Sequence, residues 1–200
     1  DLVAIVNTAN GLQRPKPLDE FETVIIGGHG AGGGFTTRIG ADPLGDSLAD
    51  AYLLLAPHLG RLLTPTSRRA FGGWQDLNAQ SMLLASGLNG LGVGLYNDTE
   101  VVRYTMPETA RYGGETRSYT FRLATELVPN DHTAITEIGG PTLTLVGGDD
   151  EAMQPSGYES LLGDAENHQL SLLDGVSHLE LMAHPKTLEQ TVAWIESLGG

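Results

Sequence analysis

The amino-acid sequence predicts an α/β fold built on a parallel sheet, and three features of the chain support this prediction. Strand patterns alternate with helical patterns along most of the 200 residues. Residues 51–56 form an unbroken apolar run that Pro57 ends, which is typical of a strand buried on both faces. A glycine-rich turn joins a strand over residues 23–26 to a helix over residues 31–39. We therefore expect one domain with a substantial core.

Each predicted element has a local reason. The β-branched residues Val24, Ile25 and Ile26 favour the first strand. Pro185 at its start and Gly199 beyond its end delimit the last helix. The full prediction has strands over residues 23–26, 51–56, 142–146 and 169–173, and helices over residues 1–12, 31–39, 155–162 and 185–198.

Residues 58–130 differ from the rest of the chain in their hydrophobic pattern. Glycines, paired arginines and scattered aromatic residues replace regular periodicity there. We expect a cap or lid inserted into a single domain of residues 1–200, with short helices such as one over residues 75–88. The pattern predicts no strong core within this insertion, and we expect its aromatic residues to serve packing more than substrate binding.

Composition excludes several classes of function. The 25 acidic residues outnumber the 11 basic ones and give a net charge of −14, which disfavours nucleic acids and anionic membranes as partners. The absence of cysteine excludes disulfides and thiolate catalysis. No apolar run approaches the roughly 18 residues of a membrane helix, so we expect a soluble protein, cytoplasmic or secreted. We also expect no cofactor and no metal. The chain starts at Asp1 without a Met, and we expect a processed or truncated product.

The glycine-rich turn matches two functional motifs. Gly28, Gly30 and Gly33 fit the phosphate-binding pattern G-x-G-x-x-G. A dinucleotide site also needs an acidic residue at the carboxyl end of the next strand, but that strand ends in Pro57 and His58. The sequence therefore disfavours dinucleotide binding.

The second motif is the G-x-S-x-G turn of serine hydrolases, in which Gly30 occupies the position of the serine. In those enzymes the nucleophile comes first along the sequence, the acid second and the histidine third, and each lies just after a strand. Asp150 follows one predicted strand and His178 follows the next. Because the carboxyl ends of parallel strands meet at one edge of the sheet, we expect Asp150 and His178 to form a hydrogen bond, with Gly30 facing His178. The backbone N–H of Ala31 is the candidate oxyanion donor.

Other histidines carry no predicted chemistry. His29, His58 and His132 are expected to be packed or hydrogen-bonded residues. His168 and His184 show no metal-ligand spacing with carboxylates.

Four stretches of the chain carry a family resemblance: Gly28-His-Gly-Ala-Gly32, Tyr52-Leu-Leu-Leu-Ala-Pro57, Val146-Gly-Gly-Asp-Asp-Glu151 and Gly175-Val-Ser-His178. Together they resemble bacterial α/β-hydrolases of the lysophospholipase or esterase kind, over nearly the whole chain. The resemblance implies the carboxyl-terminal half of that family's sheet, strands five to eight in sequence order, with a helical cap. It also implies acyl-ester substrates, Asp150 as the acid and His178 as the general base.

The chain departs from the family's pattern in two ways. The family begins with further strands, whose loop supplies a second oxyanion donor, so the resemblance implies an amino-terminally truncated member. The strand over residues 23–26 would then form an open edge, and we expect it to pair with the missing segment or with a second copy of the chain. The other departure is Gly30, which cannot form an acyl-enzyme.

Two hypotheses of different class follow. The first is a serine-hydrolase lineage acting on esters or lysophospholipids, inactive as written because Gly30 replaces the nucleophile, either naturally or by engineering. The second is a non-catalytic binding or interaction protein that retains the fold of such a pseudoenzyme. A serine at position 30 would restore the first hypothesis, whereas Ser177 is a poor substitute because it does not lie on the turn.

Overall fold

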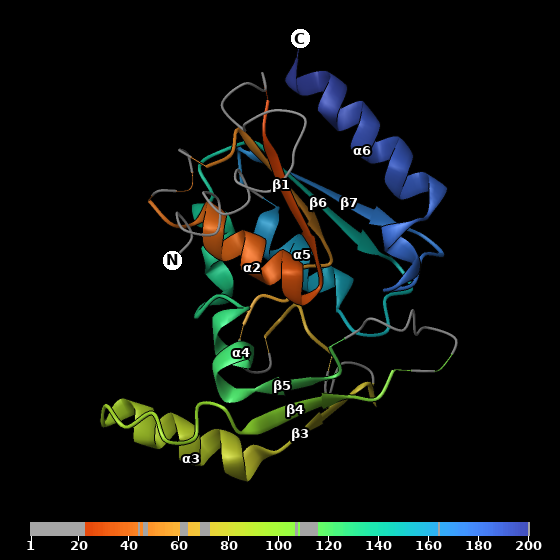
Figure 1. Cartoon of the computed structure of the whole chain (residues 1–200). Coiled ribbons are helices and arrows are strands. Elements are labelled where there is room, and N and C mark those ends of the chain that lie inside the picture. Colours follow the sequence, from red (N-terminus) through yellow and green to blue (C-terminus); the bar gives the residue numbers. More distant parts are fainter. Residues whose placement is uncertain are drawn as a thin grey trace, which may run out of the picture.

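The protein is described by a computed structural model that covers residues 23–43, 45, 48–60, 64–68, 73–106, 108, 116–163 and 165–199. The helix predicted over residues 1–12 lies outside this coverage. At the centre of the molecule is a four-stranded parallel sheet with the strand order β1-β2-β6-β7 (Figure 1). Its strands are β1 (Ile25–His29), β2 (Ala51–Leu55), β6 (Thr142–Gly147) and β7 (His168–Leu173). The predicted parallel α/β architecture and strand order are confirmed.

Strand β1 lies further along the chain than the sequence predicted. Gly27 and Gly28 continue the strand because they pair in register with Leu53 and Leu54 of β2. Parallel pairing uses only backbone groups, so two residues of low strand propensity are held in the sheet by their partner strand.

Helices flank the sheet, as Figure 1 shows for α2 and α6. Helix α2 packs on β1 and β2, α5 on β7, and α6 on β6. All six residues of β6 are buried, which explains its apolar sequence. The helices are α2 (Ala31–Gly40), α5 (Pro155–Leu162) and α6 (Pro185–Leu198), with short 3-10 helices η5 (His132–Glu137) and η6 (Glu180–Met182).

The segment between β2 and β6 forms a small α+β unit below the large sheet in Figure 1. Its strands form an antiparallel sheet of order β3-β4-β5. The unit consists of β3 (Gln75–Leu77), α3 (Ala79–Gly90), β4 (Glu100–Tyr104), β5 (Ser118–Thr120) and α4 (Phe121–Glu126).

This unit corrects two expectations for the insertion. The helix predicted over residues 75–88 begins only at Ala79, because the side chain of Asn78 caps it by accepting the N–H of Ser81 at 3.1 Å. The residues before Asn78 pair with β4 instead. The unit also has a small core of its own, which consists of Met82, Ala85, Val101, Val102 and Phe121. The residues of this core come from α3, β4 and α4. Their hydrophobic side chains therefore follow no single period along the sequence, which is why the sequence did not predict the core.

The large core lies between the parallel sheet and its helices. Leu54, Leu145 and Tyr158 are among its fully buried side chains. Each buried aliphatic side chain of this size stabilises the fold by about 1.5–3 kcal/mol. None of the helices within the described ranges is long and apolar enough to cross a membrane.

The start of α2 permits a close approach of backbones that should be sensitive to substitution. A Cβ atom at Gly34 would lie 2.3 Å from the carbonyl oxygen of His58, whereas a Cβ at Gly32 would have no neighbour within 4 Å. We expect Gly34→Ala to lower the free energy of unfolding by about 1–3 kcal/mol or more, as overpacking does. The matched variant Gly32→Ala should be neutral or up to about 1 kcal/mol more stable. Urea denaturation of both variants tests this, and equal stabilities would contradict it.

Candidate functional site

The turn between β1 and α2 holds Gly30 in a backbone conformation that favours glycine. Its φ is 55° and its ψ is −118°, and it is the residue that precedes the first turn of α2. A Cβ at Gly28 would lie 2.3 Å from the carbonyl oxygen of Gly32, and a Cβ at Gly33 would lie 2.9 Å from Cα of Pro57. The glycines flanking position 30 therefore allow a sharp turn from strand into helix.

Asp150 and His178 lie together at the carboxyl end of the sheet. His178 Nδ1 is 2.8 Å from Oδ2 of Asp150, so the two residues form the hydrogen bond expected from the sequence. Asp150 is fully buried and His178 is 7% exposed. Oδ1 of Asp150 accepts the backbone N–H groups of Ala152 at 2.9 Å and Met153 at 2.6 Å. These bonds satisfy the buried carboxylate and fix its orientation.

The loops that carry this pair are joined by further hydrogen bonds. Arg68 Nε donates to the backbone carbonyls of Asp150 at 2.9 Å and Met153 at 3.0 Å. The carboxylate of Glu151 accepts the backbone N–H of His178 at 2.9 Å. Neither Arg68 nor Glu151 was assigned a role from the sequence. No local pattern could have found them, because their partners are backbone atoms of other loops.

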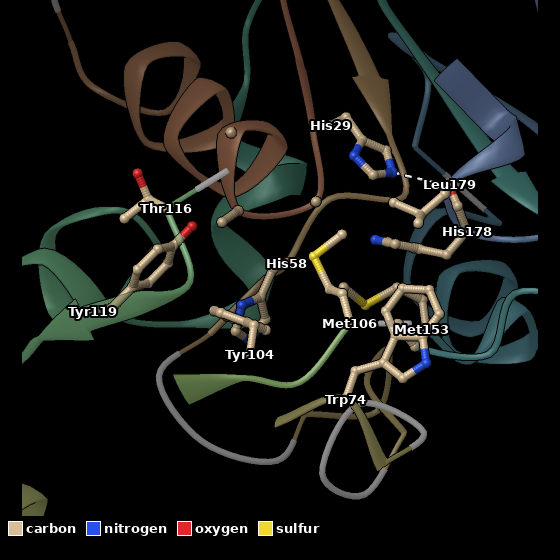
Figure 2. A pocket seen from close by; sticks show the side chains of 14 residues that line it. His29, His58, Trp74, Tyr104, Met106, Thr116, Tyr119, Met153, His178 and Leu179 are labelled. Atoms are coloured by element: carbon tan, nitrogen blue, oxygen red, sulfur yellow. Dashed lines mark hydrogen bonds between the residues drawn. The ribbon is translucent and has the colours of Figure 1, made fainter. Parts of the chain in front are cut away.

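His178 faces Gly30, as predicted. A Cβ atom at Gly30 would lie 3.4 Å from Nε2 of His178, in ordinary van der Waals contact. Figure 2 shows the His178 ring with one nitrogen pointing into the pocket. Ala31, the first residue of α2, also lines this pocket. The structure thus brings together Gly30, Ala31, Asp150 and His178.

A pocket of about 260 Å³ opens beside this group (Figure 2). One wall comes from the large sheet and its loops, and the other comes from the inserted unit. Its apolar and aromatic lining includes Trp74, Tyr104, Met106, Tyr119, Met153 and Leu179. The lining is thus mostly apolar and aromatic, and its polar members include His29, His58, Thr116 and His178.

The aromatic residues of the insertion pack together and also line the pocket. Tyr104 and Tyr119 pack against the small core of the insertion, as expected, but they also line the pocket. Their rings meet edge to face with centroids 5.1 Å apart. The ring of Trp74 lies 6.2 Å from that of His178, also edge on. Tertiary structure alone brings these side chains to the pocket that His178 lines.

Two further histidines line the pocket. The His29 ring nitrogen Nε2 lies 3.0 Å from the carbonyl oxygen of His178, and the two rings are 4.4 Å apart. Burial, and next the charge of His178, lower the pKa of His29 to about 4. The same two causes lower the pKa of His58 to about 4. Both rings are therefore neutral at pH 7, which fits the expectation of packed or hydrogen-bonded residues.

The buried His58 should make stability depend on pH. In the unfolded chain a histidine has a pKa near 6.5, so between about pH 6.5 and pH 4 the unfolded state binds a proton that the native state does not. We expect the free energy of unfolding to fall through this window, by roughly 3 kcal/mol at pH 4 from His58 alone. His58→Gln should reduce that slope. Urea denaturation of both proteins at several pH values tests this, and identical slopes would contradict it.

The sequence alone yields no relatives: no model of a protein family matches it, and no curated protein is significantly similar to it. Comparison with solved structures does find similar folds. One is the monoacylglycerol lipase of Paleococcus ferrophilus, with a TM-score of 0.58 and 15% identity over 98% of this chain and 72% of that chain. A soluble variant of monoglyceride lipase from Saccharomyces cerevisiae has a TM-score of 0.58 and 13% identity over 98% and 65%.

A third similar structure is the esterase domain of a Rhodothermus marinus protein, with a TM-score of 0.54 and 15% identity over 98% of this chain and 67% of that domain. At these identities the likeness concerns the fold. Together with the parallel sheet, its flanking helices and the turn at Gly30, these neighbours show that the chain has the α/β-hydrolase fold.

Proposed function

We propose that the chain derives from serine hydrolases that cleave acyl esters, of the lysophospholipid or related kind, and that Gly30 removes their covalent step. The observation that carries this proposal is the contact of His178 with Asp150 on one side and with the Gly30 position on the other. In an active relative, a serine at this position would donate its proton to Nε2 of the histidine and attack the ester carbonyl.

Each residue then has a role. Asp150 orients the ring of His178 and stabilises the imidazolium that forms during the reaction. The backbone N–H of Ala31 lies at the positive end of the α2 dipole, where it would face the developing oxyanion. The apolar pocket would hold the acyl chain, because its lining is dominated by aromatic and aliphatic side chains. No cofactor or metal is part of this proposal.

The inserted unit belongs to this proposal as a cap. Its residues Trp74, Tyr104 and Tyr119 close one wall of the pocket, so differences in the unit would change which acyl groups fit. We propose that residues 58–130 set the substrate range while the large sheet supplies the reacting groups.

A second candidate function is ligand binding without catalysis. The observation that favours it is Gly30 itself, because a chain without a serine hydroxyl at this position can keep the pocket and lose acyl transfer. Such a protein would bind acyl esters or their analogues through the same apolar lining.

Restoring the serine separates the two functions. We expect Gly30→Ser to hydrolyse short-chain p-nitrophenyl esters much faster than the parent chain and to be labelled covalently by a fluorophosphonate. The rate of hydrolysis should rise by several orders of magnitude, because removing the catalytic serine of a serine hydrolase lowers its rate by a similar factor. Because φ is positive at position 30, we expect the serine to lower the free energy of unfolding of this variant by about 1–3 kcal/mol.

The control is Gly30→Ser combined with His178→Ala, which should show neither activity nor labelling. Circular dichroism establishes that each variant is folded. A folded Gly30→Ser protein without esterase activity would favour the binding protein.

We further propose that the chain associates through β1. Within the described part of the sheet, β1 has a neighbour on one side only, which is β2. The outer backbone groups of an edge strand pair readily with another strand. The partner is a segment that supplies further strands or a second copy of this chain.

Association should be visible in solution. Light scattering at increasing protein concentration should give a mass above that of the monomer, because pairing covers the β1 edge. Hydrogen exchange at Ile25, whose N–H points away from β2, should become slower as the mass rises. A compact monomer at all concentrations, with the Ile25 amide strongly protected, would contradict this expectation.

A further inference from the structure

The hydrogen bond to Asp150 determines which nitrogen of His178 can act as a base. Oδ1 of Asp150 already accepts two backbone N–H groups, and Oδ2 lies 2.8 Å from Nδ1 of His178. A carboxylate accepts hydrogen bonds, so Nδ1 carries the proton in the neutral ring. Nε2 of His178 then presents a lone pair toward the pocket.

The surroundings of Nε2 suit a small hydroxyl group. Among the described residues, Nε2 has no hydrogen-bond partner, and His178 is 93% buried, since 7% of it is exposed. The position of a Cβ at Gly30 would be 3.4 Å from Nε2, so an oxygen close to that position could donate a hydrogen bond to it. The backbone groups of Gly30 are already used, because its N–H donates to Leu55 and its carbonyl accepts from Gly34 and His58. Nε2 is thus the acceptor at this end of the pocket.

The pocket has room for water beside an ester. Its volume of about 260 Å³ compares with roughly 30 Å³ for one water in the liquid. Nε2 of His178 adjoins Gly30, and the same pocket is lined by the apolar and aromatic side chains of Trp74, Met106 and Leu179. A water at Nε2 would therefore adjoin the carbonyl of an ester whose acyl chain lies along the apolar wall.

We infer that the chain with glycine at position 30 is itself a slow esterase, in which a water activated by His178 attacks the ester directly. This inference rests on the proposed function for the acyl pocket, but not on an acyl-enzyme. The substrate class is an acyl ester with an apolar chain, and the products are a carboxylic acid and an alcohol.

The reaction balances without another reactant. The water oxygen bonds to the carbonyl carbon while its proton moves to Nε2 of His178, and the carbonyl oxygen becomes an oxyanion facing the N–H of Ala31. The bond to the leaving oxygen then breaks, and the proton on Nε2 passes to that oxygen. Asp150 stabilises the imidazolium between the two transfers. No covalent intermediate with the protein forms.

The test follows the hydrolysis of p-nitrophenyl butyrate by the purified chain. We expect steady release of p-nitrophenol without a burst, insensitive to a fluorophosphonate. His178→Ala should lower the rate about 100-fold, which is the lower range for loss of a general base. Gly30→Ala should lower it about tenfold or more, because the methyl group occupies the position of the water.

Ser177→Ala is the matched control, since Oγ of Ser177 donates to the carboxylate of Glu180 at 2.7 Å and the residue is adjacent to His178 in the chain. Its rate should be unchanged. Added methanol should yield methyl butyrate in a His178-dependent reaction, because it can replace water at Nε2. Circular dichroism establishes that the His178 and Gly30 variants are folded.

The outcomes separate this inference from the proposed function. If Gly30→Ser becomes an active, labelled esterase while the parent chain shows no His178-dependent hydrolysis, direct attack by water is wrong and the proposed lineage stands. Labelling of the parent chain, or loss of activity in Ser177→Ala, would also overturn the inference. His178-dependent hydrolysis without labelling supports it even if Gly30→Ser gains nothing.

Discussion

The site depends on the close approach of α2 to the loop that follows β2. Gly34 lies against the carbonyl of His58, and the carbonyl of Gly30 accepts the N–H of His58 at 2.8 Å. Backbones can approach this closely only where side chains are absent. The contact places Gly30 at the carboxyl edge of the sheet, where His178 and Asp150 also lie. Close packing of the backbones thus requires glycines in this turn, independently of any reaction.

The buried carboxylate of Asp150 imposes the second constraint. A buried charge without partners would be strongly destabilising, so the loop after β6 must supply donors. It does so with two backbone N–H groups, and Arg68 binds the carbonyls of the same loop. Orientation of His178 therefore follows from the same hydrogen bonds that make burial of Asp150 tolerable. This arrangement does not depend on the side chain at position 30, because none of these bonds involves that residue.

Gly30 lies among groups that the fold holds in fixed positions. The oriented histidine, the start of α2 and the apolar pocket are all present around Gly30. In serine hydrolases these groups provide binding, proton transfer and oxyanion stabilisation, while the serine provides the covalent step.

The sequence by itself determined the parallel α/β architecture, the order of its four strands, and the meeting of Asp150, His178 and Gly30. The architecture and the meeting of the three residues rest on local signals, because apolar runs identify buried strands and parallel strands bring their carboxyl ends to one edge. The strand order followed from the family resemblance. Contacts in the folded chain were needed to show that Gly27 and Gly28 belong to β1, that Gln75–Leu77 is a strand, and that Trp74, Tyr104 and Tyr119 form a pocket wall. These features arise from contacts between residues distant in the chain, where a partner strand or a facing loop outweighs local propensity.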